Sequence, residues 1–95
     1  MHVRVVRFTD VTAERVTAML ARVEQSDGPP PDVPITGLQM YFDADQGTAV
    51  VLQMFDSAED MRAGGEAMGR IDAGDTPGTR VSVDLCELKL ERMPG

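Results

Sequence analysis

Five polar and aromatic residues recur at alternate positions of three short apolar segments and are the best candidates for chemistry in the chain. These candidates are Arg4, Gln39, Tyr41, Gln53 and Phe55. Because alternate residues of an extended chain point to the same side, we expect the five side chains to share one face of a sheet.

A guanidinium, two amides, a phenol and an aromatic ring on one concave face would suit a small aromatic ligand. The polar groups would orient the carbonyl or phenol oxygens of the ligand, and apolar surroundings would hold its rings. Tyr41 or Arg4 would then deprotonate or polarise the ligand. The alternative interpretation is that the five residues form the rim of a dimer interface.

Neither the histidine nor the cysteine of the chain is expected to be catalytic. His2 is the single histidine and lies where a strand begins, so we expect a solvated residue rather than the partner of a nucleophile or a haem ligand. Cys86 lies in an alternating apolar run, where a cysteine is typically a small buried side chain.

The acidic residues are better explained by turns and helix ends than by a metal site. The segment 43–47, Asp-Ala-Asp-Gln-Gly, resembles the start of a calcium loop, but its glycine comes one position early and no acid stands where the last ligand is needed. Asp56, Glu59 and Asp60 suit the positive end of a helix dipole. We therefore predict no metal ion and no cofactor.

The charge balance argues against partners with anionic surfaces. The chain has 9 basic and 16 acidic residues and a net charge of −7, whereas nucleic acids and anionic membranes call for a basic surface. It has no apolar run of membrane-spanning length and no apolar leader after Met1. A lone Cys86 suits a reducing compartment, so we expect a cytoplasmic protein. The preference for arginine over lysine is typical of GC-rich bacterial genomes.

Hydrophobic periodicity places the candidates on strands that alternate with helices. Alternating or β-branched runs predict strands over 3–8, 35–42, 48–55 and 81–91. Helical spacing predicts two helices capped by Thr12 (or Asp10) and by Ser57. A hairpin turn should join the two middle strands at 43–47.

Two features of the C-terminal half are irregular. Gly64 and Gly65 fall within the second helix, where each costs about 1 kcal/mol relative to alanine, so either the helix breaks or something packs closely against it. In the last strand the apolar positions change side between Leu85 and Cys86, which predicts a bulge or a change in the surface that the strand packs on.

The order of elements predicts one ferredoxin-like α+β domain over residues 1–95, a four-stranded antiparallel sheet with both helices on one face. The side toward the helices is expected to hold Val3, Val5, Leu38, Met40, Phe42, Val50, Leu52 and Met54. The other side is expected to hold the five candidates with Val6, Phe8 and Val51. So much apolar surface on an uncovered face predicts a homodimer.

The segment 47–62, Gly-Thr-Ala-Val-Val-Leu-Gln-Met-Phe-Asp-Ser-Ala-Glu-Asp-Met-Arg, resembles the hairpin-to-helix segment of the dimeric α/β-barrel superfamily. It is most similar to small bacterial proteins related to antibiotic biosynthesis monooxygenases, in which a strand ending in an aromatic residue runs into an acid, a small helix cap and an acidic helix start. The resemblance implies two subunits that join their sheets into a barrel, with a pocket between sheet and helices or inside the barrel. Members include cofactor-independent oxygenases and haem-degrading enzymes.

This chain departs from the catalytic pattern of that family. The characterised enzymes use an asparagine and a tryptophan of this sheet, sometimes with a histidine, and this chain contains no asparagine and no tryptophan. Phe55 stands at the tryptophan position and Val51 at the asparagine position. Two function classes follow: a cofactor-independent, monooxygenase-like enzyme acting on a small aromatic or polyketide-type substrate, and a non-catalytic homodimer that binds a small ligand or a partner.

Overall fold

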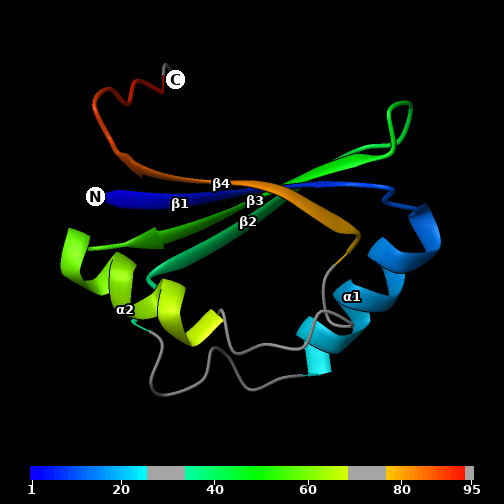
Figure 1. Ribbon diagram of the computed structural model, residues 1–95, viewed down its shortest axis with the longest axis horizontal. Coiled ribbons are helices and arrows are strands. Elements are labelled where there is room, and N and C mark those ends of the chain that lie inside the picture. Colours follow the sequence, from blue (N-terminus) through cyan, green and yellow to red (C-terminus); the bar gives the residue numbers. More distant parts are fainter. Residues whose placement is uncertain (26–33, 69–76, 94–95) are drawn as a thin grey trace.

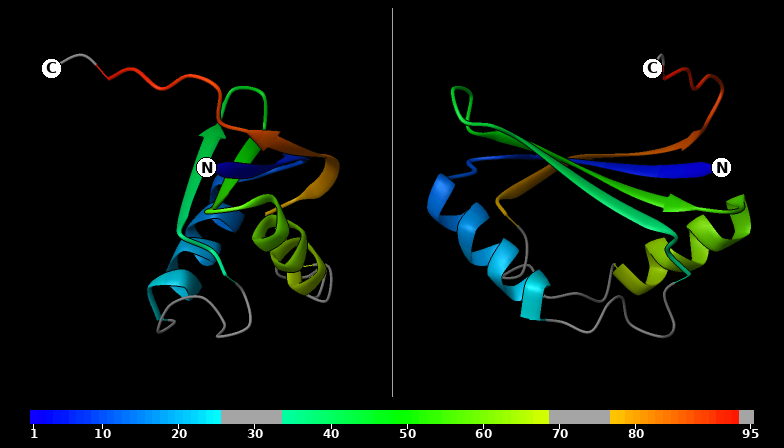
Figure 2. Two further views of the ribbon diagram at one scale, coloured as in Figure 1. Left: turned by 90° about the vertical axis from the view of Figure 1, so that its left-hand side faces the viewer. Right: turned by 180° about the vertical axis from the view of Figure 1, so that it is seen from behind.

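The computed structural model describes residues 1–25, 34–68 and 77–93. In chain order the elements are β1 (His2–Thr9), α1 (Ala13–Gln25), β2 (Gly37–Asp43), β3 (Thr48–Phe55), α2 (Ala58–Met68) and β4 (Thr79–Glu87). The strands form one antiparallel sheet in the order β2-β3-β1-β4 (Figure 1). Both helices lie on the same side of this sheet (Figure 2). The predicted ferredoxin-like α+β fold is confirmed.

Side-chain caps begin both helices where the sequence predicts. The backbone N–H of Arg15 donates to Thr12 Oγ1 at 3.2 Å, and that of Asp60 donates to Ser57 Oγ at 3.1 Å. Because the Ser57 cap follows the end of β3 at once, α2 turns directly back under the sheet.

The turn between β2 and β3 is the predicted hairpin. The Asp43 carboxylate accepts a hydrogen bond from Gln46 Nε2 at 2.7 Å and one from the Gln46 backbone at 3.2 Å. These hydrogen bonds, the side-chain one first, lower the pKa of Asp43 below its ordinary value. Gly47 supplies the positive φ of 65° that the turn needs.

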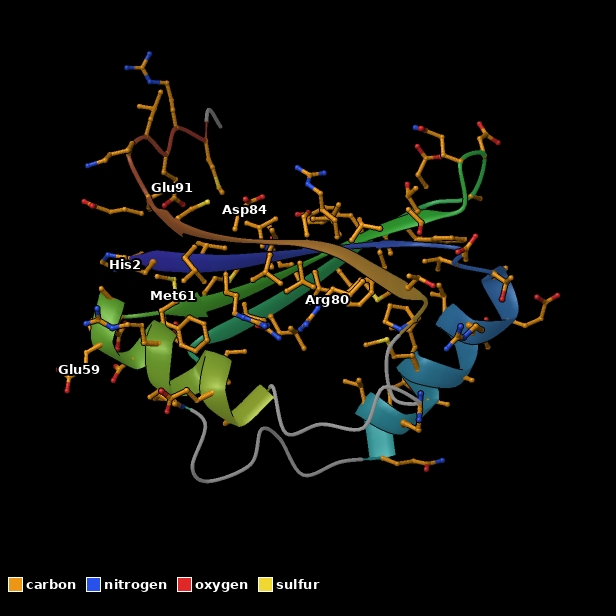
Figure 3. The ribbon with its side chains drawn as sticks, viewed as in Figure 1. His2, Glu59, Met61, Arg80, Asp84 and Glu91 are labelled. Carbon is orange, nitrogen blue, oxygen red and sulfur yellow. The ribbon has the colours of Figure 1, made fainter. Side chains whose placement is uncertain are left out.

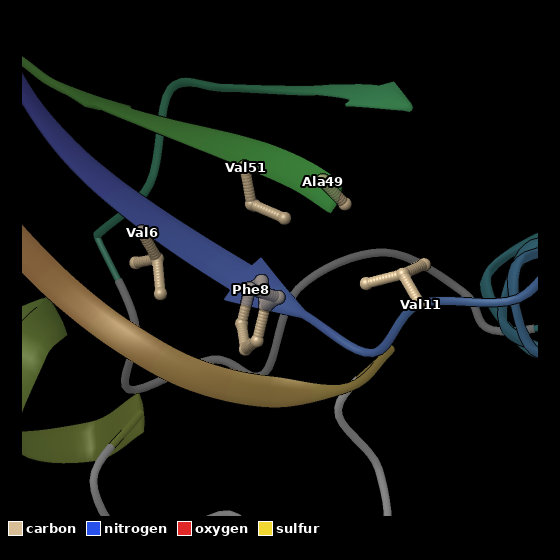
Figure 4. Packing of buried hydrophobic residues seen from close by; sticks show 5 residues of the cluster. All are labelled: Val6, Phe8, Val11, Ala49 and Val51. Atoms are coloured by element: carbon tan, nitrogen blue, oxygen red, sulfur yellow. The ribbon is translucent and has the colours of Figure 1, made fainter. Parts of the chain in front are cut away.

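The core lies between the sheet and the start of α1. Its buried residues are Val6, Phe8, Val11, Ala49 and Val51 (Figure 4), with Val16, Met40 and Phe42 packed against them. Leu20 and Val23, farther along α1, are 48% and 46% exposed. Helix α1 is therefore anchored at its N-terminal end, and α2 is left to cover the other half of the sheet.

The predicted faces of β1 and β3 are wrong. The helix side holds Arg4, Val6, Phe8, Val51, Gln53 and Phe55. The opposite side, which we call the open face, holds Val3, Val5, Val50, Leu52 and Met54, with Gln39 and Tyr41 of β2. Both sides of these strands are apolar, so alternation alone could not choose between them. The rings of Phe8 and Phe55 determine which side of β1 and β3 faces the helices, because each packs into the layer beneath the helices.

For β2 the predicted face is right, since Met40 and Phe42 point to the helices. The predicted register of β2 against β3 is wrong. The hairpin pairs Phe42 with Ala49 and Met40 with Val51. Directly opposed residues share a face, so the expected grouping of Phe42 with Leu52 cannot form.

Strand β4 is shorter than predicted, and its bulge lies elsewhere. The register against β1 skips Val81, near the start of the strand. Leu85 and Cys86 alternate regularly across the sheet, and the strand ends at Glu87. Residues 88–93 then run away from the sheet on the side of the open face (Figures 1 and 2).

Candidate functional site

A buried polar pair lies in the middle of the helix side of the sheet. Arg4 and Gln53 oppose each other in the register of β1 and β3, and Arg4 Nη1 donates to Gln53 Oε1 at 2.8 Å. Each residue is only 7% exposed. We call this pair the Arg4–Gln53 site.

Helix α2 covers one end of the Arg4–Gln53 site. A Cβ built on Gly65 would lie 3.5 Å from Arg4 Nε, so the guanidinium runs beneath this turn of the helix. A Cβ on Gly64 would overlap the ring of Phe55, which is 0% exposed. The glycine pair therefore lets α2 lie close to the sheet, and Met61 adds a buried side chain on the same helix face (Figure 3). Of the two explanations that the sequence left open for these glycines, close packing is confirmed and α2 is unbroken.

The guanidinium of Arg4 has no counter-charge in the part of the chain that the structure describes. Its one hydrogen bond there is to the neutral amide of Gln53. Burial, and then the nearby cation Arg80, lower the pKa of Arg4 from its ordinary value. Arg80 opposes Phe8 in the register and lies beneath β4 on the helix side (Figure 3). Within the described residues, the site therefore brings two cationic side chains near each other in a chain whose net charge is −7.

Apolar side chains flank the pair on both sides. One row across the sheet runs Leu38, Gln53, Arg4, Leu85, because β2 pairs Leu38 with Gln53 and β4 pairs Leu85 with Arg4. Leu38 is 52% and Leu85 56% exposed although both lie on the helix side. A buried polar centre with uncovered apolar flanks is typical of a site for a small amphipathic molecule.

The five predicted site residues do not share one surface. Arg4, Gln53 and Phe55 point to the helices, whereas Gln39 and Tyr41 lie on the open face. There the Tyr41 hydroxyl donates to Gln39 Oε1 at 2.9 Å. Phe55 packs beneath α2 and does not line an open site. Of the five predicted site residues, Arg4 and Gln53 therefore remain as a pair.

His2 and Cys86 also differ from expectation. His2 is half-buried rather than solvated, and its Nδ1 is buried without a hydrogen-bond partner in the structure. Cys86 is exposed rather than buried, because it lies on the edge strand β4 and faces away from the helices. Among the residues described, no group of three or more His, Cys, Asp or Glu side chains is placed to hold a metal ion.

Sequence reasoning missed Arg80, Gly65 and Leu85 as parts of the site. The glycine pair was a usable signal, since a helix tolerates such residues where something must approach it closely. Arg80 and Leu85 gave no local signal, because their place depends on the bulge at Val81 and on the register of β4 against β1.

Comparison with known proteins supports the fold. The structure is similar to that of Rv0793 from Mycobacterium tuberculosis, with a TM-score of 0.50 and 15% identical residues over 98% of this chain and 100% of that chain. Such a low identity concerns the fold alone. Protein-family models gave no match, and a search of curated proteins gave none. No helix in the described ranges has the length and apolar character needed to cross a membrane.

Proposed function

We propose that this protein is a homodimer, similar to antibiotic biosynthesis monooxygenases, that binds a small aromatic ligand without catalysing its conversion. The observation that carries the proposal is the Arg4–Gln53 site. Arg4 is buried and has no counter-charge among the described residues. Such burial destabilises the folded protein, and groups of this kind are frequent at ligand-binding sites. The single Cys86 favours a cytoplasmic location.

The open face supports pairing with a second copy. Its residues Val3, Val5, Val50, Leu52 and Met54 form an apolar patch that neither helix covers. Leu90 and Met93, on the segment that leaves the sheet on this side, are 78% and 83% exposed. Apolar surface of this kind is usually covered in a homo-oligomer, most often through two-fold symmetry.

The separation of Tyr41 from Arg4 favours binding over catalysis. Both had been candidates to polarise or deprotonate one ligand, but they lie on opposite sides of the sheet. The Tyr41 hydroxyl donates a hydrogen bond to Gln39 Oε1. Phe55 and Val51, at the positions of the family's catalytic tryptophan and asparagine, are buried apolar residues. Of Tyr41 and Arg4, only Arg4 is then left at the site, and a guanidinium stays protonated and cannot act as a general base.

Native mass spectrometry of the purified protein, without added ligand, tests this proposal. We expect a dimer that carries a discrete extra mass. Denaturation should release an aromatic compound, and incubating this compound with the protein should leave it unchanged. Leu52→Asp should give monomers, because it places a charge in the middle of the open face, whereas Glu59→Lys on the exposed side of α2 should not. A wild-type monomer would contradict the dimer, and turnover of the released compound would contradict the non-catalytic function.

A further inference from the structure

We propose that the ligand of the Arg4–Gln53 site is a carboxylate with a small apolar body, whose charged group pairs with the Arg4 guanidinium. This inference rests on the proposed ligand-binding function and adds the chemical class of the ligand. Three observations carry it: the charge at the site, the donors left free there, and the apolar flanks.

The charge at the site calls for an anion. Arg4 is buried, Arg80 lies close enough to lower its pKa further, and no acidic side chain of the described chain contacts either guanidinium. A neutral ligand would leave this uncompensated charge as it is. A carboxylate would neutralise it, and in surroundings of low dielectric a charge-assisted hydrogen bond is stronger than one between neutral groups.

Hydrogen-bond donors remain for both oxygens of a carboxylate. Arg4 uses Nη1 to hold Gln53 Oε1, so its other N–H groups and the amide nitrogen of Gln53 make no hydrogen bond within the described chain. Among the described side chains, the wholly buried polar atoms without a partner are His2 Nδ1 and Ser82 Oγ. The free donors of Arg4 and Gln53 are not among these atoms and so keep contact with solvent. A guanidinium presents paired donors that match a carboxylate in one plane.

The apolar flanks indicate what the carboxylate is attached to. Leu38 and Leu85 lie on either side of the pair in the same row of the sheet and are half exposed. An inorganic anion would leave them in water, whereas an aromatic or aliphatic body would cover them and gain free energy in proportion to the buried area. An aromatic acid therefore fits the site better than phosphate.

Isothermal titration of the full chain with benzoate, benzamide and inorganic phosphate, at constant ionic strength, tests the inference. Benzamide has the shape of benzoate without its charge. We expect benzoate to bind at least about tenfold more tightly than benzamide or phosphate, as a charge-assisted hydrogen bond implies. Gln53→Glu is the decisive variant, because it places an internal carboxylate beside Arg4 at nearly unchanged volume. It should abolish benzoate binding, whereas Gln25→Glu, the same change in charge at the exposed end of α1, should leave it unchanged.

Each other result has a separate meaning. Equal affinities for benzoate and benzamide would overturn the carboxylate and leave the ligand-binding function standing. Tighter binding of phosphate, or undiminished benzoate binding by Gln53→Glu, would also overturn the inference. If Gln53→Glu failed to fold, Arg4→Met would replace it, with a loss of at least about tenfold in benzoate affinity expected. If neither benzoate nor benzamide bound the wild type, the inference would fail, and the function would fail with it if native mass spectrometry also found no bound compound.

Discussion

Replacing the two neighbouring glycines of α2 by alanine should change stability in opposite directions. At Gly65 the new Cβ would meet Arg4 Nε at 3.5 Å and Arg4 Cδ at 3.8 Å, which are ordinary van der Waals contacts. At Gly64 it would overlap the ring of Phe55, which is 0% exposed. The positions have the same helical environment, so the difference between them isolates the contact with the sheet.

The magnitudes follow from the two environments. Gly65→Ala gains the helix propensity of alanine without a clash, and we expect the free energy of unfolding to rise by about 0.5–1 kcal/mol. Gly64→Ala gains the same propensity but overpacks a rigid, fully buried ring, which costs about 3 kcal/mol at the upper end of measured cases. The net loss is then about 2 kcal/mol, equivalent to a fall in Tm of roughly 10 °C for a chain of this size.

Urea denaturation of both variants at one protein concentration would measure the difference, with equal m-values as the condition for comparing midpoints. Phe55→Leu added to Gly64→Ala should recover part of the loss, because leucine leaves room for the new methyl group. A Gly64→Ala variant as stable as Gly65→Ala would refute the close packing of α2 on Phe55.

Three further predictions follow from the described contacts. Ser57→Ala removes the cap of α2 and should lower the free energy of unfolding by about 1 kcal/mol in urea titrations, whereas a loss near zero would contradict the cap. The hydrogen bonds from Gln46 depress the pKa of Asp43, so their stabilisation is present above the unfolded pKa of about 3.9 and is lost as pH falls through the lower folded value. Asp43→Asn should therefore remove part of the pH dependence of Tm below about pH 4, and an unchanged acid profile would contradict this. The double variant Arg4→Met, Gln53→Leu replaces the buried polar pair by apolar residues and should raise the free energy of unfolding by about 1–4 kcal/mol while benzoate binding is lost. A less stable double variant would show that the pair serves the fold.

The sequence was sufficient to predict the fold because its local signals agree with one another. The alternating runs, the caps at Thr12 and Ser57 and the turn at 43–47 each specify one element. Strand–helix–strand units of these lengths then leave few ways to arrange four strands and two helices. Element ends were less certain, as β4 shows, because β4 ends at Glu87, opposite His2 where its antiparallel partner β1 begins.

The site was only half predictable. Arg4 and Gln53 were correctly grouped, since β1 and β3 were correctly phased against each other. Their side of the sheet was not predictable from hydrophobicity, because valines occupy both faces of β1 at Val5 and Val6. Tyr41 lies away from the helices as expected, but its grouping with Arg4 and Gln53 was wrong, because the register of β2 against β3 differs by one residue from the expected one.

Arg4 is buried beneath α2 with no counter-charge in the described ranges, so packing alone does not explain its presence on the helix side. Valine or leucine at these positions would suit the layer beneath α2 at least as well. A group that weakens the fold in this way is consistent with a binding function that offsets its cost when the ligand is present.

The most direct test of the account is a crystal structure of the protein with bound benzoate. We predict that the benzoate carboxylate lies within hydrogen-bond distance of Arg4 and Gln53 on the helix side of the sheet, with its ring over Leu38 or Leu85, in each subunit of a dimer joined through the open faces. Benzoate bound on the open face beside Gln39 and Tyr41, or an Arg4–Gln53 site that stays empty at saturating benzoate, would contradict it.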